Sequence, residues 1–167
     1  MTYERIEEML RTYRNEVGRC GHLEAEIREL EAEIRRERAM LAEEVASPHA
    51  QVITDMPRGT GVGNPTEKFG MLLASGWEPD EIREKVAKLA ELREEIAERG
   101  KTVEYVNRWM SGLPERERWV ITKQMLDGVV WRDVVKQYQE QFGEYRSKDT
   151  IKRIRDRALD LIYDMAE

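Results

Sequence analysis

The feature that most constrains this chain is a stripe of apolar residues that repeats along its first part. Over residues 6–45, apolar side chains recur mainly at alternating intervals of three and four, at Ile6, Leu10, Tyr13, Val17, Cys20, Leu23, Ile27, Leu30, Ile34, Leu41 and Val45. This spacing puts them on one face of a long amphipathic helix and is typical of a coiled coil. The repeat slips by one residue between Cys20 and Leu23, beside Gly18 and Gly21, so we expect a phase shift, a bend or a short break there.

Composition points to the same class of fold. The chain has 167 residues, of which 40% are hydrophobic and 37% are charged, and this balance suits long exposed helices better than one large globular core. Proline is rare, with 5 residues in all, and three of them lie between Pro48 and Pro65. Patterns typical of strands are nearly absent. We therefore predict an all-α protein.

The cell compartment is predicted from what the sequence lacks. Cys20 is the single cysteine, so no internal disulfide can form. No apolar run approaches the roughly 18 residues of a membrane span. The acidic start, MTYERIEEML, lacks the apolar core of a signal peptide. We expect a cytoplasmic protein that does not associate with a membrane.

A segment rich in glycine and proline, DMPRGTGVGNPTEK at residues 55–68, ends the first helical pattern. Its glycines suggest a phosphate-binding loop, but a Walker loop requires Gly-Lys-Ser/Thr at the start of a helix, and here Lys68 follows Glu67. We interpret the segment as a connection that launches the next helix, with Asn64 as the N-cap and Pro65 as the first helical residue.

A second helical region extends to about Ser111 and is interrupted at SGWEPD, residues 75–80. Its apolar residues continue the helical spacing. The two long helices can therefore pack together as an antiparallel hairpin or pair with a second copy of the chain, and sequence alone leaves both arrangements open. We predict a coiled-coil or helical-hairpin region over residues 1–112, with a loop at 47–64.

The remaining part of the chain, residues 113–167, differs in charge and in the length of its helices. It holds 11 Lys/Arg and 11 Asp/Glu, whereas residues 1–112 hold 17 and 23, so the net charge of -6 falls in the front part. Pro114 opens a helix that Gly128 closes, a second helix WRDVVKQYQEQF follows, and Ser147 caps the last one. This part is predicted to be a separate domain of short helices.

The last helix concentrates positive charge at its start. Six basic residues lie between Arg146 and Arg157, with only two aspartates among them. The apolar residues fall on one face, which we expect to pack inward: Ile151, Ile154, Ala158, Leu161 and Met165. A helix N-terminus already carries partial positive charge, so cations on its exposed side favour a bound anion such as the phosphate of DNA. Pairing of these cations with acids such as Glu140 and Glu144 is the alternative.

The segment LPERERWVITKQMLDGVVWRDVVKQYQEQFGEYRSKDTIKRIRDRALDLI resembles the promoter-reading fourth region of bacterial sigma factors. The similarity lies in Leu-Pro followed by Glu-Arg-Glu-Arg, a helix that ends in glycine, a helix-turn-helix, and a basic close with Arg153, Arg157, Ala158 and Leu159. Trp131, the coiled segment and the loop DMPRGTGVGNPTE resemble phage transcriptional regulators of the RinA and ArpU type within that superfamily. The resemblance implies a small helix-turn-helix domain at 113–167 and a sequence-specific DNA-binding regulator that activates late or packaging genes of phages and prophages.

The resemblance also implies which residues meet DNA. Base contacts fall on Ser147, Lys148, Thr150, Ile151 and Lys152, and phosphate contacts on Arg132, Arg146, Arg153 and Arg155. Ile151 also belongs to the inward face, so a core position is the alternative for it. Four aromatic residues are expected to pack inside the protein: Trp119, Trp131, Phe142 and Tyr145. The chain departs from the sigma pattern at Val130, where a Ser or Thr cap is usual, and in its longer turn, QEQFGEYRS.

The predicted partner is double-stranded DNA. One helix-turn-helix module rarely buries enough surface for tight specific binding, so we expect a homodimer, and the coiled region offers a surface for a second copy or for RNA polymerase. A DNA-packaging adaptor of the small-terminase type joins the same two parts and is the alternative function. The only histidines, His22 and His49, have no Cys or second His at metal-ligand spacing. We therefore predict no metal, no cofactor, no catalytic residue and no enzymatic activity.

Overall fold

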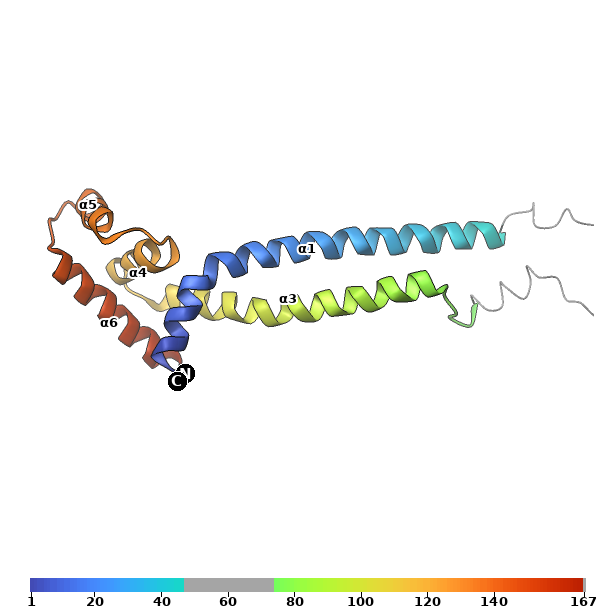
Figure 1. Cartoon of the computed structure of the whole chain (residues 1–167), viewed down its shortest axis with the longest axis horizontal. Helices are drawn as coiled ribbons and strands as arrows, with labels where there is room; N and C mark the ends of the chain where they lie inside the picture. The colour runs from blue at the N-terminus through green and yellow to red at the C-terminus, as the bar shows by residue number, and fades with distance from the viewer. Residues whose placement is uncertain (47–73, 167) are drawn as a thin grey trace, which may run out of the picture. The chain divides into compact units, whose positions relative to one another are not determined.

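The computed structural model describes residues 1–46 and 74–166, and every regular element within these ranges is helical (Figure 1). The elements are α1 (Tyr3–Ala46), α3 (Asp80–Gly112), α4 (Glu115–Ile121), the π-helical segment η2 (Thr122–Leu126), α5 (Trp131–Phe142) and α6 (Lys148–Ala166). The prediction of an all-α protein is confirmed. None of the helices in the described ranges is long and apolar enough to cross a membrane. The predicted loop at 47–64 and the N-cap at Asn64 lie outside the described residues.

Local sequence signals set several helix ends. α3 begins after the interruption predicted at 75–80, where the carbonyl of Pro79 accepts a hydrogen bond from the Ile82 amide at 3.1 Å. α5 is followed by Gly143, whose φ of 68° lies in the left-handed region that glycine adopts without strain. The Gly143 amide donates to the carbonyl of Gln139 at 2.9 Å and closes the helix.

α1 is a continuous helix of 44 residues that passes through Gly18 and Gly21, so the short break, one of the three alternatives expected there, is absent. The chain does divide nearby into two compact units, one made of Met1–His22 with Glu95–Glu167 and the other of Leu23–Glu94. α1 and α3 each contribute to both units. The slip in the apolar repeat therefore coincides with the point at which α1 leaves one core and enters the other.

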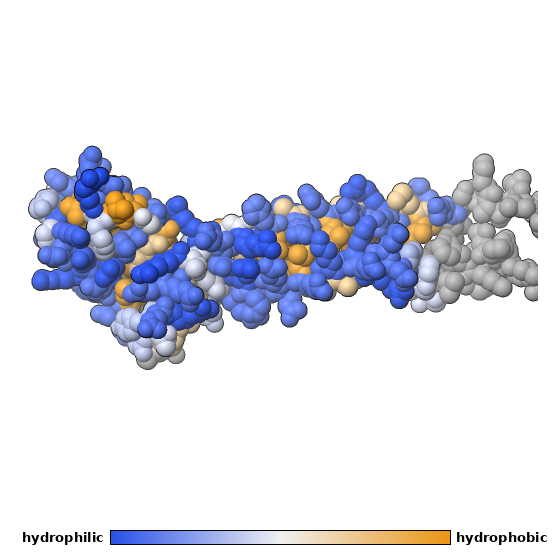
Figure 2. Space-filling view, in the orientation of Figure 1, coloured by the Kyte–Doolittle hydropathy of each residue, from blue (hydrophilic) through white to orange (hydrophobic). Residues whose placement is uncertain are grey.

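In the unit Leu23–Glu94, α1 and α3 lie side by side and antiparallel. The buried apolar residues come from both helices: Leu23, Leu30, Ile34, Ile82, Leu89 and Leu92. Glu26 pairs with Lys88 at 2.9 Å, and Glu37 pairs with Lys85, so residue numbers rise on α1 as they fall on α3. Figure 2 shows hydrophobic surface along this unit between hydrophilic flanks. The apolar stripes of the two helices thus pack against each other within one chain.

The other unit has a core that joins both ends of the chain. It combines the first turns of α1, the end of α3, α4 with η2, and the second half of α6, at Ile6, Met9, Leu10, Val106, Trp109, Leu113, Ile121, Met125, Ala158, Leu159 and Ile162. The core of this unit does not follow the predicted boundary between residues 112 and 113, because the helices after that boundary share their core with residues 1–22 and 95–112. The charge balance and the sequence motifs predicted where the short helices begin. The core against which these helices pack also contains residues of both long helices, α1 and α3.

Tyr3 ties the start of α1 to α6 through two contacts. Its ring stacks on that of Tyr163, with the ring centroids 4.4 Å apart and the planes inclined by 9°. Its hydroxyl donates a hydrogen bond to Asp160 Oδ1 at 2.7 Å. This hydrogen bond to a carboxylate is the main reason why the pKa of Tyr3 is raised to about 12.

We expect the alkaline stability of the protein to depend on Tyr3. Folding raises its pKa from 10.0 to about 12, so the hydrogen bond stabilises the protein below pH 10 and its contribution is lost as the pH rises through about 12. Tyr3→Phe should lower the free energy of unfolding below pH 10, and its difference from wild type should shrink towards pH 12. Urea unfolding followed by circular dichroism measures this difference. Asp160→Asn removes the charge of the acceptor, so its free energy of unfolding should show the same weaker dependence on pH. A difference between wild type and Tyr3→Phe that stays constant with pH would refute the role assigned to the Tyr3–Asp160 hydrogen bond.

Candidate nucleic-acid interface

α5, the turn at 143–147 and α6 form the part of the structure that the sequence predicted as a helix-turn-helix. In Figure 1, α5 is seen nearly end-on and α6 from the side, so the two helices cross. A small core holds them together through Val120 from α4, Val134 and Tyr138 from α5, and Ile151 from α6, all at 0% exposure. This core determines which side of α6 faces solvent.

Aromatic residues surround this core, as predicted for three of the four. Trp119, Trp131 and Phe142 are partly buried against it, and the Trp119 ring meets the Tyr138 ring edge-on, with 5.6 Å between centroids. Tyr145 is 70% exposed, so the prediction that it packs inside is wrong. Tyr145 lies in the turn, where no helical periodicity directs its side chain towards the core.

Side-chain hydrogen bonds close the first turn of α6. Ser147 Oγ accepts a hydrogen bond from the Thr150 amide at 3.3 Å and lies 3.0 Å from Thr150 Oγ1. The N-cap predicted at Ser147 is confirmed. The two hydroxyl groups, which were expected to contact bases, therefore bond to each other in the free protein. At the start of α5, Val130 occupies the N-cap position without a side-chain hydrogen bond, because valine has no polar side-chain atom.

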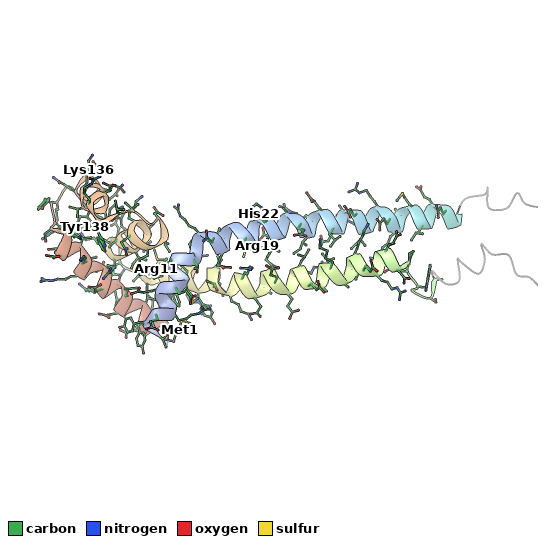
Figure 3. The ribbon with its side chains drawn as sticks, viewed as in Figure 1. Met1, Arg11, Arg19, His22, Lys136 and Tyr138 are labelled. Carbon is green, nitrogen blue, oxygen red and sulfur yellow. The ribbon has the colours of Figure 1, made fainter. Side chains whose placement is uncertain are left out.

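The exposed side of α6 carries cations without a partner in the described part of the chain. Of the lysines and arginines in residues 1–46 and 74–166, four form neither an ion pair nor a hydrogen bond with another described residue: Lys136, Lys148, Lys152 and Arg153. The last three lie in the first half of α6 and were predicted to contact DNA. Lys136 was missed and projects from the outer side of α5 (Figure 3). Lys136 follows Arg132 by four residues, a spacing that places both on one face of α5. This spacing could have identified Lys136 from the sequence.

Other predicted phosphate contacts have acidic neighbours. Arg132 is 91% exposed, with Nε 3.4 Å from Asp133 Oδ1. Arg155 is held more firmly, because its Nε lies 2.8 Å from Asp156 Oδ1 and its guanidinium lies 5.4 Å from the centroid of the Trp131 ring. Only 29% of the Arg155 side chain is exposed. The geometry therefore favours a role for Arg155 in packing α6 against α5 over a phosphate contact.

Ile151 is the clearest correction among the predicted base contacts. It has 0% exposure and belongs to the same core as Val134 and Tyr138. A side chain without accessible surface cannot reach a base edge in the major groove, so the predicted base contact is wrong. The core position, which was the alternative for Ile151, is the one that the structure has.

Glu144 joins two arginines just before the start of α6. Its carboxylate accepts a forked pair of hydrogen bonds from Arg116, at 3.3 and 3.4 Å, and a hydrogen bond from Arg146 at 2.9 Å. The hydrogen bonds from Arg146 and from Arg116 lower the pKa of Glu144. Arg116 also lies over the ring of Phe142, 5.5 Å from its centroid. The alternative drawn from the sequence, in which cations pair with Glu144, thus holds for Arg146, whereas Lys148 has no such pair among the described residues.

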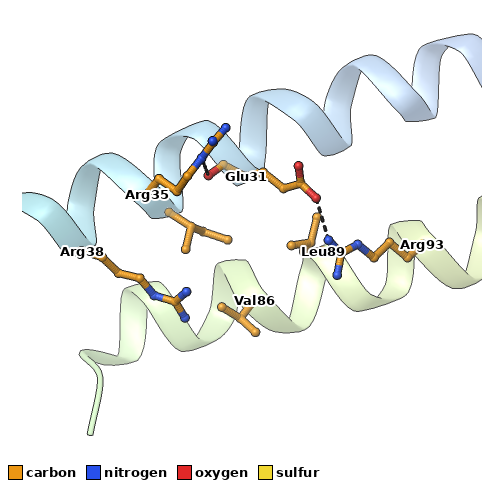
Figure 4. Close-up of a pocket in the computed structure, with 7 residues that line it drawn as sticks. Glu31, Arg35, Arg38, Val86, Leu89 and Arg93 are labelled. Carbon is orange, nitrogen blue, oxygen red and sulfur yellow. Dashed lines mark hydrogen bonds and ion pairs between the residues drawn. The ribbon is translucent and has the colours of Figure 1, made fainter. Parts of the chain in front are cut away.

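A shallow groove lies between α1 and α3 in the unit Leu23–Glu94 (Figure 4). Its volume is about 430 Å³, and it is lined by Glu31, Ile34, Arg35, Arg38, Val86, Leu89 and Arg93. Arg93 lies 2.6 Å from Glu31, and Arg38 pairs with Glu78, so two of its cations are neutralised within the unit. Across the described ranges, no three His, Cys, Asp or Glu side chains are grouped so that they could hold a metal ion.

Comparison with known proteins gives no match. No family model matches the chain, no curated protein is similar to it, and no solved structure matches it. The geometry and charge of α5, the turn and α6 are therefore the features that indicate a function.

Proposed function

We propose that the protein binds double-stranded DNA through the exposed first half of α6 and regulates transcription at the bound site. The observation that carries this proposal is the set of cations Lys148, Lys152 and Arg153, which have no acidic partner among the described residues. Positive side chains near a helix N-terminus are unfavourable because the helix dipole is already positive there. A bound anion relieves this repulsion, and the phosphates of a DNA backbone supply anions in a row.

The way α6 packs suits a helix that enters the major groove. Its Ile151 is buried in one core with Val134 and Tyr138 of α5, so this core fixes the orientation of the helix that carries the cations. α5 crosses α6 (Figure 1), and its Arg132 and Lys136 are both exposed to solvent. In a helix-turn-helix, the first helix lies across the DNA backbone while the second reads the groove, and these two residues suit the first role.

The distribution of charge over the two units supports the same assignment. Leu23–Glu94 contains 10 Lys/Arg and 16 Asp/Glu, which accounts for the whole net charge of -6, while the unit that includes α6 contains 18 of each. An acidic surface repels DNA, and a balanced one with clustered cations attracts it locally. We therefore assign DNA to the unit with α6, and a second copy of the chain or RNA polymerase to the acidic unit.

Selection from a pool of random-sequence duplexes tests this proposal. The full-length protein should retain duplexes that share a sequence motif, and their binding should weaken steeply as salt increases. If no duplex is retained, or if retention does not respond to salt, the proposal fails. The mass of the protein in solution separates the two functions that the sequence suggested. A monomer or dimer suits the regulator, and a ring of many subunits suits the packaging adaptor.

A further inference from the structure

The contacts of Glu144 are those that a DNA phosphate would make. Two guanidinium groups, from Arg116 on α4 and Arg146 in the turn, converge on its single carboxylate, the first as a fork. Guanidinium groups bind carboxylate and phosphate oxygens with the same planar, forked geometry. The three side chains are between 43% and 46% exposed, so the site is open to an incoming backbone.

Arg116 keeps its place independently of Glu144. Its guanidinium lies over the Phe142 ring, 5.5 Å from the centroid, and Phe142 packs against the core that holds α5 to α6. Arg146 stands two residues before Lys148, at the start of the cationic side of α6. If the carboxylate moved away, the positive surface would extend from Lys148 through Arg146 to Arg116.

We propose that Glu144 occupies Arg116 and Arg146 in the free protein in place of a DNA phosphate, and thereby limits the affinity of the protein for DNA of unrelated sequence. This inference rests on the proposed DNA-binding function. Affinity for DNA of any sequence depends on how many phosphates the protein neutralises, and Glu144 withholds two arginines from that number. On a target site, base contacts from α6 favour close approach, and the arginines exchange the carboxylate for phosphate. Glu144 is thus a specificity-determining residue.

Glu144→Gln tests the inference, with Glu140→Gln as its matched control. Glu140 is exposed, lies one helical turn earlier on α5, and forms no ion pair with a described residue, so its replacement removes the same charge without releasing an arginine. For a labelled duplex of scrambled sequence, we expect Glu144→Gln to bind roughly tenfold more tightly than Glu140→Gln at low salt, with a salt slope steeper by about two. For a duplex recovered by selection, affinity should rise less, so discrimination between the two duplexes should fall.

A second variant shows whether the released arginines cause the effect. Adding Arg116→Gln to Glu144→Gln should reduce the salt slope by about one, because one of the two released cations is removed again. Equal affinities of Glu144→Gln and Glu140→Gln for the scrambled duplex would overturn the role of Glu144 and leave the proposed function standing. If wild-type protein binds neither duplex, the proposed function itself fails. Thermal unfolding of each variant, expected to be close to that of wild type, confirms that folded proteins are compared.

Discussion

Replacing Lys148 and Lys152 together with alanine is expected to remove most of the affinity for DNA with little effect on the fold. Neither side chain pairs with a described residue, so their removal breaks no ion pair or hydrogen bond within that part of the protein. A hydrogen bond to a charged group contributes about 1.5–3 kcal/mol, so each lysine should account for roughly a tenfold or greater change in Kd. Fluorescence anisotropy with a labelled duplex measures the loss. The slope of log Kd against log salt should fall by about two.

The matched control replaces Lys88 and Lys101, two exposed lysines on α3, with alanine. This pair removes the same charge, but both lysines pair with glutamates of their own unit, Glu26 and Glu98. Affinity for DNA should change far less than in the α6 variant. Equal losses in the two double variants would mean that only the overall charge of the chain matters, and the role assigned to α6 would have to be abandoned.

Trp109→Ala is expected to lower the free energy of unfolding by about 3–5 kcal/mol, the usual cost of removing a large buried aromatic side chain. Trp109 is 1% exposed and lies in the core that Leu10 of α1 and Ile162 of α6 share. Urea unfolding measures the change. Because α6 depends on this core, its backbone amides should exchange hydrogen faster in the variant, even though Trp109 lies outside residues 113–167.

Trp77→Ala is the control for this substitution. Trp77 belongs to the unit Leu23–Glu94 and is 39% exposed, so its replacement should cost much less stability and leave the exchange of α6 unchanged. Exchange in α6 that is insensitive to Trp109→Ala would instead restore the boundary between residues 112 and 113 that the sequence suggested.

The helices and their ends followed from local signals. Periodic apolar residues predicted the long helices, Pro79 and Asp80 marked the start of α3, and Ser147 marked the start of α6. Such signals act within one or two helical turns, so a single stretch of sequence contains all the information that they need. The same limit explains why α1 has no break at Gly18, because a glycine lowers helix propensity by only about 1 kcal/mol and a long packed helix continues through it.

The sequence predicted the kind of site, a cationic helix, but only some of the residues that form it. A cluster of cations on the last helix was visible in the sequence, and Lys148, Lys152 and Arg153 remain its members without an ion pair among the described residues. The apolar spacing contained Ile151 as well, and the sequence could not decide between a base contact and the core. In the structure, Ile151 is buried in one core with Tyr138, so the core position holds.

By itself, the sequence determined that the protein is all-α, where most of its described helices begin and end, and that positive charge gathers at the start of α6. The tertiary structure alone decided that Ile6 and Ile162 share one core, that Arg155 lies over Trp131, and that Glu144 binds Arg116. Helix formation depends on neighbours a few residues apart, so local pattern specifies it. Which faces meet depends on residues far apart in the chain, and they are brought together only when the apolar stripes of several helices are buried at once.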